Sequence, residues 1–225
     1  MTFFEGIQQF FTALFKFMPK FLPGVGNTLL LSVLSILLGT VIGLFAVMLR
    51  LSKKKPLVMI SNFYITIIRG TPLLLQLYFI FFGLPDMGIM IDRFPSAVLG
   101  LAIHSGAYIS EIFRGSIESI DYGQREAAKA LGMTNFQAMK RIILPQAFKR
   151  SVPALGNQFI ISIKDSSLAS VITITETILL ARQFAAATFN VFPIYTLAGA
   201  YYLLITLGLS KVLNKVELRL KVNER

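Results

Sequence analysis

The chain has 225 residues, of which 55% are hydrophobic and only 15% are charged. A soluble globular domain of this length needs more polar residues to cover its surface, so the composition excludes a soluble domain. It predicts an all-α polytopic membrane protein. A transmembrane helix takes about 20 apolar residues, so we expect about five spans in a single domain over residues 1–225. The absence of cysteine excludes disulfides and thiolate metal sites, and one histidine gives no basis for a metal site.

Residues 1–20 begin with an amphipathic pattern. Phe3, Ile7 and Phe10 recur at helical spacing, while Glu5 and several glutamines occupy the other side. A signal peptide starts with positive charge followed by an unbroken apolar run, which this segment lacks. We therefore predict an uncleaved helix lying in the membrane interface. The alternative is that this segment simply begins the first span.

Five apolar stretches predict the membrane spans, and two of them contain internal breaks. The predicted spans are residues 21–49, 57–84, 94–113, 152–175 and 189–210. Pro72 has no N–H to donate to Ile68 and disfavours a helical residue before it, so the second span is expected to break there. The fourth span is expected to break at the polar run Lys164-Asp165-Ser166-Ser167.

Most of the basic residues gather at three places along the chain. Of the 22 Lys and Arg residues, 16 lie in residues 50–55, 114–150 and 211–225. With five spans these segments fall on one side of the membrane, which the positive-inside rule makes cytoplasmic. The N-terminus is then outside and the C-terminus cytoplasmic. Because the basic residues form no separate domain, we expect no nucleic-acid partner.

The cytoplasmic loop, residues 114–150, contains a pattern that indicates a helical hairpin. The pattern is Glu126-Ala127-Ala128, three residues, Gly132, nine residues, Ile142, one residue, then Leu144-Pro145. Gly132 suits the left-handed position after a first helix. Thr134 and Gln137 form a capping box for a second helix, and Pro145 is expected to end it.

The hairpin offers a surface on which another protein could pack. Phe136, Met139 and Ile143 put an apolar stripe on the second helix, and Ala127 and Ala128 leave the first helix open to close approach. A DNA-binding helix–turn–helix has a similar outline, but a hairpin tethered between two spans cannot easily lie in a major groove. Packing of the hairpin on its own subunit is the structural alternative.

This spacing resembles the EAA signature of ABC-importer permeases, and residues 22–215 are similar to the polar-amino-acid branch of that family. The matching motifs are Arg69-Gly70-Thr71-Pro72-Leu73-Leu74, Gly106-Ala107-Tyr108, Glu111-Ile112-Phe113-Arg114-Gly115, Ile143-Leu144-Pro145-Gln146-Ala147, Leu155-Gly156-Asn157 and Lys164-Asp165-Ser166-Ser167-Leu168. Ser166 stands where relatives often carry Thr, a change that keeps the hydroxyl.

The resemblance implies a type I ABC-importer permease fold in a bacterial cell membrane, with the hairpin docked in a groove of an ATPase. It also implies two ATPase subunits, a second permease copy or paralogue, and an extracellular or periplasmic solute-binding protein. The chain has no phosphate-binding loop, so we expect no enzyme activity and no cofactor in it; ATP and Mg would be bound by the partner ATPase. The coupling residues would be Glu126, Ala127, Ala128, Gly132, Phe136, Ile142 and Pro145.

Polar side chains within the spans mark a candidate substrate pathway, because an ionisable residue at a helix centre costs about 2.5–3.5 kcal/mol to insert. His104, Tyr108 and Glu111 share one face of the third span. The other candidates lie at the two breaks and are Arg69, Lys164, Asp165, Ser166 and Ser167.

The polar side chains allow two interpretations. Acidic groups would meet the ammonium of a zwitterion, and Arg69 would meet its carboxylate. In the structural alternative, Glu111 pairs with Arg114, and Lys164 with Asp165 to lock the break. For His104 alone, a structural hydrogen bond is favoured over contact with a ligand.

Together these patterns predict the permease subunit of an ABC importer for a polar L-amino acid. Cystine, glutamine and basic amino acids are the candidate substrates, in that order, because residues 83–97 also resemble cystine-type permeases. The rival hypothesis is a secondary transporter or channel subunit acting without an ATPase, which would need no hairpin of this spacing.

Overall fold

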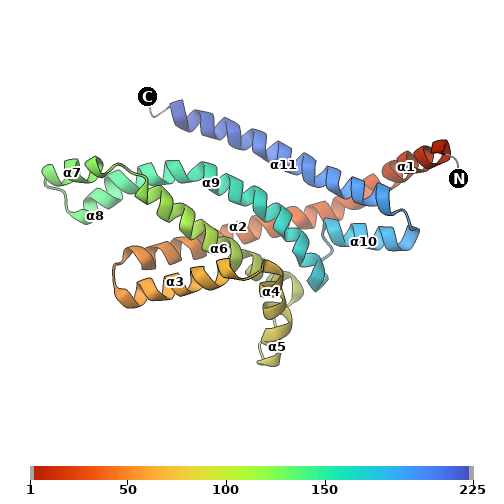
Figure 1. Ribbon diagram of the computed structural model, residues 1–225, viewed down its shortest axis with the longest axis horizontal. Coiled ribbons are helices and arrows are strands. Elements are labelled where there is room, and N and C mark those ends of the chain that lie inside the picture. The colour runs from red at the N-terminus through yellow and green to blue at the C-terminus, as the bar shows by residue number, and fades with distance from the viewer. Residues whose placement is uncertain (1–2, 223–225) are drawn as a thin grey trace.

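The computed structural model describes residues 3–222, and these form an elongated bundle of helices without strands (Figure 1). The α-helices are α1 (Phe3–Phe17), α2 (Leu22–Leu51), α3 (Lys55–Gly70), α4 (Leu73–Tyr78), α5 (Leu84–Asp86), α6 (Arg93–Glu118), α7 (Tyr122–Ala130), α8 (Asn135–Ala138), α9 (Leu144–Asp165), α10 (Thr177–Thr188) and α11 (Val191–Val222). Two 3-10 segments, η1 (Met18–Phe21) and η4 (Ser166–Ile172), and two π segments, η2 (Phe79–Gly83) and η3 (Met139–Ile143), join some of them.

The described chain has three helices that can span a membrane, or the predicted five if each bent pair of helices counts as one span. Three stretches of the described chain are long and apolar enough alone: Phe4–Leu51, Arg93–Glu118 and Val191–Leu220. Two bent pairs raise the number to five if each pair is one span, namely Lys55–Gly70 with Leu73–Asp86 and Asn135–Ile172 with Thr177–Thr188. The predicted all-α membrane fold is therefore confirmed.

The centre of the bundle is a close crossing of α2 and α6. A Cβ added at Gly43 would lie 2.8 Å from the carbonyl oxygen of Gly106, and one at Gly39 would lie 3.0 Å from that of Ala102. Glycine lets two helix backbones approach this closely, which is how helices gain packing energy in lipid. Helix α3 joins the pair through the Tyr64 hydroxyl, which donates to the carbonyl oxygen of Ile103 at 2.7 Å.

The predicted break at Pro72 is confirmed. Helix α3 ends at Gly70, α4 begins at Leu73, and the two axes differ by 107°. The Gln76 side-chain amide donates to the carbonyl oxygen of Ile68 at 2.8 Å and to that of Thr71 at 3.1 Å. Gln76 therefore supplies the donor that Pro72 lacks.

In the fourth segment, the helix changes type at the predicted polar run, but its axis bends further along. Ser166 and Ser167 donate their hydroxyl protons to the carbonyl oxygens of Ile163 and Lys164, at 2.8 and 2.6 Å. The chain continues from there as the 3-10 segment η4, because these bonds satisfy carbonyls that the α-helix leaves free. The 52° bend follows η4, where Thr173 adopts a left-handed conformation with φ of 63°.

The prediction that Pro145 ends the second hairpin helix is wrong. Helix α8 continues through the π segment η3 into α9, and Pro145 lies in the first turn of α9. The backbone N–H of Leu144 donates to the carbonyl oxygen of Met139, five residues back. This wider turn accommodates a residue that has no N–H to donate.

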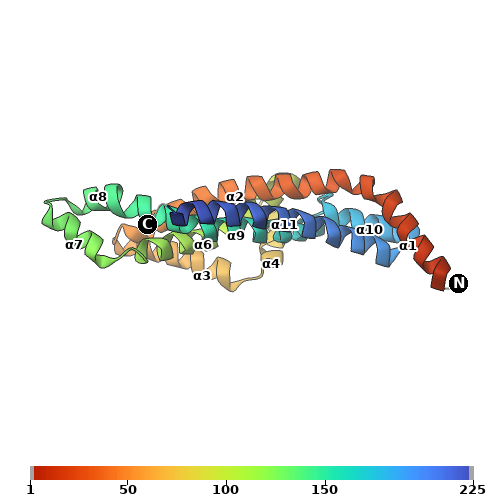
Figure 2. The ribbon, with the colours of Figure 1, turned by 90° about the horizontal axis from the view of Figure 1, so that it is seen from above.

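The three basic segments lie at the same end of the molecule. Figure 1 shows the α2–α3 turn, the α7–α8 hairpin and the C-terminal end of α11 at the left, with the N-terminus at the right. Helix α1 bends away from α2 (Figure 2). Its residues Ala13 and Phe17 pack with Ile194 and Leu197 of α11. Its placement in the membrane interface stays a prediction.

We predict that the α2–α6 crossing tolerates no side chain at Gly43. Gly43→Ala should destabilise the fold by about 1–3 kcal/mol, because the new methyl group meets a backbone oxygen that cannot move aside. The matched control is Gly26→Ala in the same helix, where a Cβ has no atom within 4 Å and should cost nothing. The measurement is the fraction of detergent-solubilised protein that stays monodisperse after heating. Equal heat resistance of the two variants would contradict the prediction.

Candidate functional site

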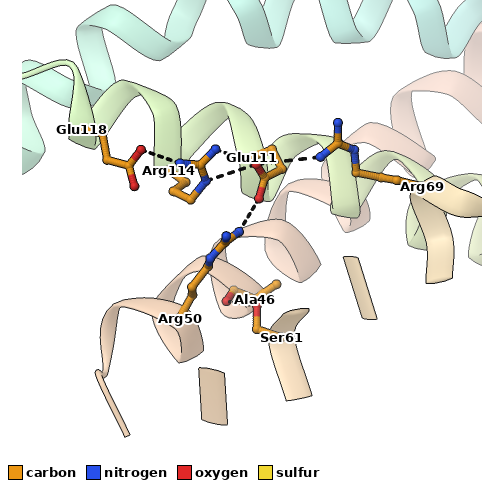
Figure 3. A network of polar contacts seen from close by, with 7 residues as sticks. All are labelled: Ala46, Arg50, Ser61, Arg69, Glu111, Arg114 and Glu118. Atoms are coloured by element: carbon orange, nitrogen blue, oxygen red, sulfur yellow. Dashed lines mark hydrogen bonds and ion pairs between the residues drawn. The ribbon is translucent and has the colours of Figure 1, made fainter. Parts of the chain in front are cut away.

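A charged cluster joins three helices near the basic end of the bundle (Figure 3). Glu111 of α6 accepts hydrogen bonds from Arg50 of α2 and from Arg114 of its own helix, the latter with Nη2–Oε2 at 2.8 Å. Arg114 also pairs with Glu118, one turn further along α6. The Glu111 side chain is 19% exposed, and both its oxygens are engaged by arginine. The predicted Glu111–Arg114 pair is therefore present.

Arg69, the last charged residue of α3 before the break, is held less firmly than the other two arginines. Its Nη1 lies 3.8 Å from Glu111 Oε2, too far for a hydrogen bond. Its guanidinium carbon lies 5.4 Å from the ring centroid of Tyr108, within reach of a cation–π interaction. The side chain is 45% exposed. Arg69 is thus the least tightly paired of the three arginines around Glu111.

His104 connects the first break to α6. Its Nδ1 lies 3.1 Å from Oε1 of Gln76, the residue that also satisfies the carbonyls freed by Pro72. The imidazole packs 5.1 Å, centroid to centroid, from the Tyr108 ring. This is the structural hydrogen bond that the sequence favours for His104. The structure brings Arg69, His104, Tyr108 and Glu111 together along one face of α6.

The second polar group, Lys164 to Ser167, forms no ion pair with the first. Lys164 is exposed and Asp165 is half-buried, and the two make no salt bridge among the described residues. The expected lock of the break by this pair is therefore absent, and the two serine hydroxyls perform that role instead. Within residues 3–222, the Asp165 carboxylate accepts no hydrogen bond and joins no salt bridge.

The helix α4, which follows the first break, and the 3-10 segment η4, which precedes the second bend, pack against each other. Leu73 and Leu77 of α4 share one buried cluster with Ala169 and Ile172 of η4. Asp165 stands directly before η4, and Gln76 lies within α4. Backbone that departs from α-helix in a span is tolerated where it is buried in protein or lines a polar path. The two breaks therefore form one region of the molecule.

The hairpin formed by α7 and α8 has the predicted turn. Gly132 adopts φ of +76°, and its N–H donates to the carbonyl oxygen of Lys129 at 2.9 Å. The capping box is complete: the Gln137 N–H donates to Thr134 Oγ1 at 3.2 Å, and the Thr134 N–H donates to Gln137 Oε1 at 2.9 Å. Each of these features follows from local sequence alone.

The expected coupling residues divide into two groups. Glu126, Ala127, Gly132, Phe136 and Pro145 are exposed, Phe136 with 75% of its surface, whereas Ala128 is fully buried and Ile142 half-buried. Ala128 therefore does not offer its helix to a partner as expected, because its side chain is already buried within this chain. Ile143 of the expected stripe is also buried, in a cluster with Ile117, Ile120 and Ala147. The hairpin packs partly on its own subunit and leaves its outer face open.

Several residues that organise these regions were not identified from sequence. Sequence alone presents Arg50 as a basic residue at the end of a span, and the one signal for Gln76 is that it follows Pro72 by one helical turn. Glu176 is fully buried, accepts the N–H groups of Ile178 and Leu179 at 2.8 and 2.7 Å, and accepts the Tyr202 hydroxyl at 2.9 Å. An acidic residue just before an apolar helical stretch is the signal of an N-cap that could have revealed it.

Sequence relatives and solved structures agree with this architecture. The chain is 40% identical to the arginine transport system permease protein ArtQ of Bacillus subtilis (strain 168). The match extends over 215 residues and covers 95% of this chain and 98% of that protein. It is 42% identical to the L-cystine transport system permease protein TcyB of the same organism, over 91% and 88% of the two chains. It is 40% identical to the glutamine transport system permease protein GlnP of Escherichia coli (strain K12), over 94% of this chain and 97% of that protein.

A crystal structure of an amino acid ABC transporter with histidines superimposes with a TM-score of 0.90 at 41% identity, covering 93% of this chain and 98% of that one. An inward-facing MetNI methionine ABC transporter shares the fold, with a TM-score of 0.70 at 22% identity. Residues 35–219 match the family described as the binding-protein-dependent transport system inner membrane component. With the bent helix pairs and the α7–α8 hairpin in place, the chain belongs to this family of membrane transport components.

Proposed function

We propose that this chain is the membrane-spanning permease subunit of an ATP-driven ABC importer, and that it translocates a polar L-amino acid delivered by an external solute-binding protein. The observation that carries the proposal is the likeness, along nearly the whole chain, to permeases named for arginine, L-cystine and glutamine transport. A transporter working without an ATPase has no need of the exposed hairpin at residues 122–143.

The hairpin is the proposed contact with the ATPase, which would bind ATP and Mg. Its outer face presents the Phe136 ring, Glu126 and the Gly132 turn to the side where the basic segments gather. That side is cytoplasmic by the positive-inside rule, which leaves the N-terminus outside. Because α8 continues into α9, a push on the hairpin moves a continuous helical rod, Asn135–Ile172, that contains Asp165. A second permease copy or a paralogue completes the pathway.

The cargo's two charged groups are assigned to different residues. Arg69 binds the carboxylate, because its separation from Glu111 is long and its side chain is exposed. Glu111 itself is engaged by Arg50 and Arg114, so it orients the cluster and does not bind the ammonium. Asp165, half-buried and without a salt bridge in the described chain, is the carboxylate that binds the ammonium.

The substrate class follows from this pairing of charges. A free carboxylate and a free ammonium describe an α-amino acid, and the polar surroundings favour a polar side chain. Cystine, glutamine and basic amino acids are the candidates in that order. The relatives named for arginine, L-cystine and glutamine lie between 40% and 42% identity, so identity does not rank these substrates.

The proposed function is tested by reconstituting the permease with its ATPase and binding protein in liposomes. We expect ATP hydrolysis to rise with one or a few polar amino acids when all twenty and cystine are assayed separately. The corresponding amino-acid amides, which lack the carboxylate, should give no rise. Stimulation by a sugar, a metal ion or an oligopeptide, with none by amino acids, would contradict the proposal.

Gly132 tests the coupling role of the hairpin. Gly132→Val should insert normally but lose cargo-stimulated ATP hydrolysis, because valine at φ of +76° costs about 1–3 kcal/mol and reshapes the turn. The matched control is Gly115→Val at an exposed helical position, where a Cβ has no atom within 4 Å. Stimulation of the Gly132 variant to the level of the control would remove the hairpin from the coupling path.

Asp165 tests the binding of the cargo's ammonium. Asp165→Asn keeps the size of the side chain but loses its charge, and the loss of one charge-assisted hydrogen bond should slow uptake by about tenfold or more. Binding of the cargo to the external protein should stay unchanged. Asp86→Asn serves as the control, because Asp86 is an exposed carboxylate far from Asp165 in the sequence. Full uptake by the Asp165 variant would assign this residue a structural role.

A further inference from the structure

An apolar groove opens beside the base of the hairpin. It has a volume of about 480 Å³ and lies between the last turns of α2, the end of α6 and the start of α9. Its walls include Leu44, Val47, Met48, Phe113, Phe136 and Phe148, and they contain no charged side chain. Met48 and Phe148 are 66% and 60% exposed, so the groove is open to its surroundings.

A basic cavity of about 500 Å³ adjoins this groove. The two share Leu51, Phe136 and Met139 in their walls. Lys53 of the α2–α3 turn and Arg125 and Lys129 of α7 line the basic cavity, and no acidic residue among those that the structure describes does. None of these three cations is in a salt bridge with another described residue. Three cations therefore line this cavity without a carboxylate of residues 3–222 within 4.0 Å of any of them.

This pairing matches the chemistry of an anionic phospholipid. Basic pockets between membrane helices on the cytoplasmic side recognise anionic headgroups through their phosphates. The adjoining groove is apolar along its length and accepts an acyl chain, which gains free energy for each methylene that it buries. We propose that the two cavities form one binding site for an anionic phospholipid, with its phosphate between Lys53, Arg125 and Lys129 and one acyl chain along α2.

The depth of the groove favours a lipid over a soluble protein as its occupant. Leu44 lies six residues before Arg50, which at 1.5 Å per residue places it about 9 Å deeper along α2 than the charged end of that helix. A lipid tail reaches this level from within the bilayer, whereas an ATPase approaches the hairpin from water. The bound lipid would tie the α2–α3 turn to α7, so it would link the span to the hairpin.

The test uses the full chain, which has no native tryptophan. Met48→Trp places a fluorescent ring in the groove, and Met59→Trp, at a methionine of α3 that is 71% exposed and outside both cavities, is the matched control. Each variant is reconstituted with traces of phosphatidylglycerol or phosphatidylcholine carrying brominated acyl chains, which quench tryptophan on contact. At position 48, phosphatidylglycerol should reach half-maximal quenching at a concentration at least about fivefold lower than phosphatidylcholine does. A factor of about five is the effect of one cation near an anionic headgroup. At position 59 the two lipids should be equal.

The headgroup contacts are tested in the Met48→Trp background. The combined change Lys53→Gln, Arg125→Gln and Lys129→Gln should abolish the preference for phosphatidylglycerol. The combined change Lys140→Gln, Arg141→Gln and Lys149→Gln removes the same charge from exposed positions of the same loop outside both cavities and should leave it intact.

Equal quenching by the two lipids, or a preference that survives the first triple change, would overturn the proposal. The measurement is repeated with the ATPase bound, and loss of quenching there would assign the groove to the ATPase. None of these readouts depends on transport, so their failure is separate from a failure of the proposed function.

Discussion

Backbone groups that lose their helix partners inside a membrane must find other hydrogen bonds, because hydrocarbon supplies none. This constraint governs both breaks in the chain. At the first, the Gln76 amide takes the carbonyl oxygens of Ile68 and Thr71. At the second, two serine hydroxyls take the last carbonyls of α9, and the buried carboxylate of Glu176 takes the first N–H groups of α10. Each break is thereby held in one conformation.

The same constraint brings the polar side chains of the first break to α6. The Gln76 side-chain amide uses both of its polar atoms. Its nitrogen donates to a carbonyl oxygen at the break, and its oxygen lies at hydrogen-bond distance from His104. His104 in turn packs on Tyr108, whose ring lies under the guanidinium of Arg69. Arg69 is therefore positioned by weak contacts on a rigid support. That arrangement agrees with the proposed role of Arg69, in which it exchanges Glu111 for the carboxylate of the cargo.

Helical continuity connects the hairpin with the second break. The π segment η3 lets α8 run into α9 despite Pro145, and α9 then runs to Asp165 and η4. The hairpin is consequently the end of a rod whose other end lies at the candidate site, and not a loop with a hinge at its base. The buried contacts of Ile143 and Ala147 with Ile117 and Ile120 hold that rod against α6. The hairpin is thus connected to the second break through packed helices.

Local sequence determines many of the structural elements of this protein. Apolar stretches of span length, the break at Pro72, the left-handed turn at Gly132 and the capping box of Thr134 and Gln137 were all predicted, and the structure contains them. These features depend on residues within about one helical turn of each other, or on the plain need to bury apolar length. The family resemblance also came from local motifs, because spacing along the chain survives without knowledge of the fold.

The tertiary structure decided which side chains meet. Arg50 pairs with Glu111 across 61 positions of sequence, and Thr28 pairs with Thr177 across 149. No local pattern specifies such partners, since they depend on how α2 crosses its neighbours. The tertiary structure also determines what Pro145 does. Packing of Ile143 against α6 stabilises a continuous helix, although proline by itself favours a break. Local preference yields wherever the burial of a whole helix face contributes more free energy than one lost hydrogen bond costs.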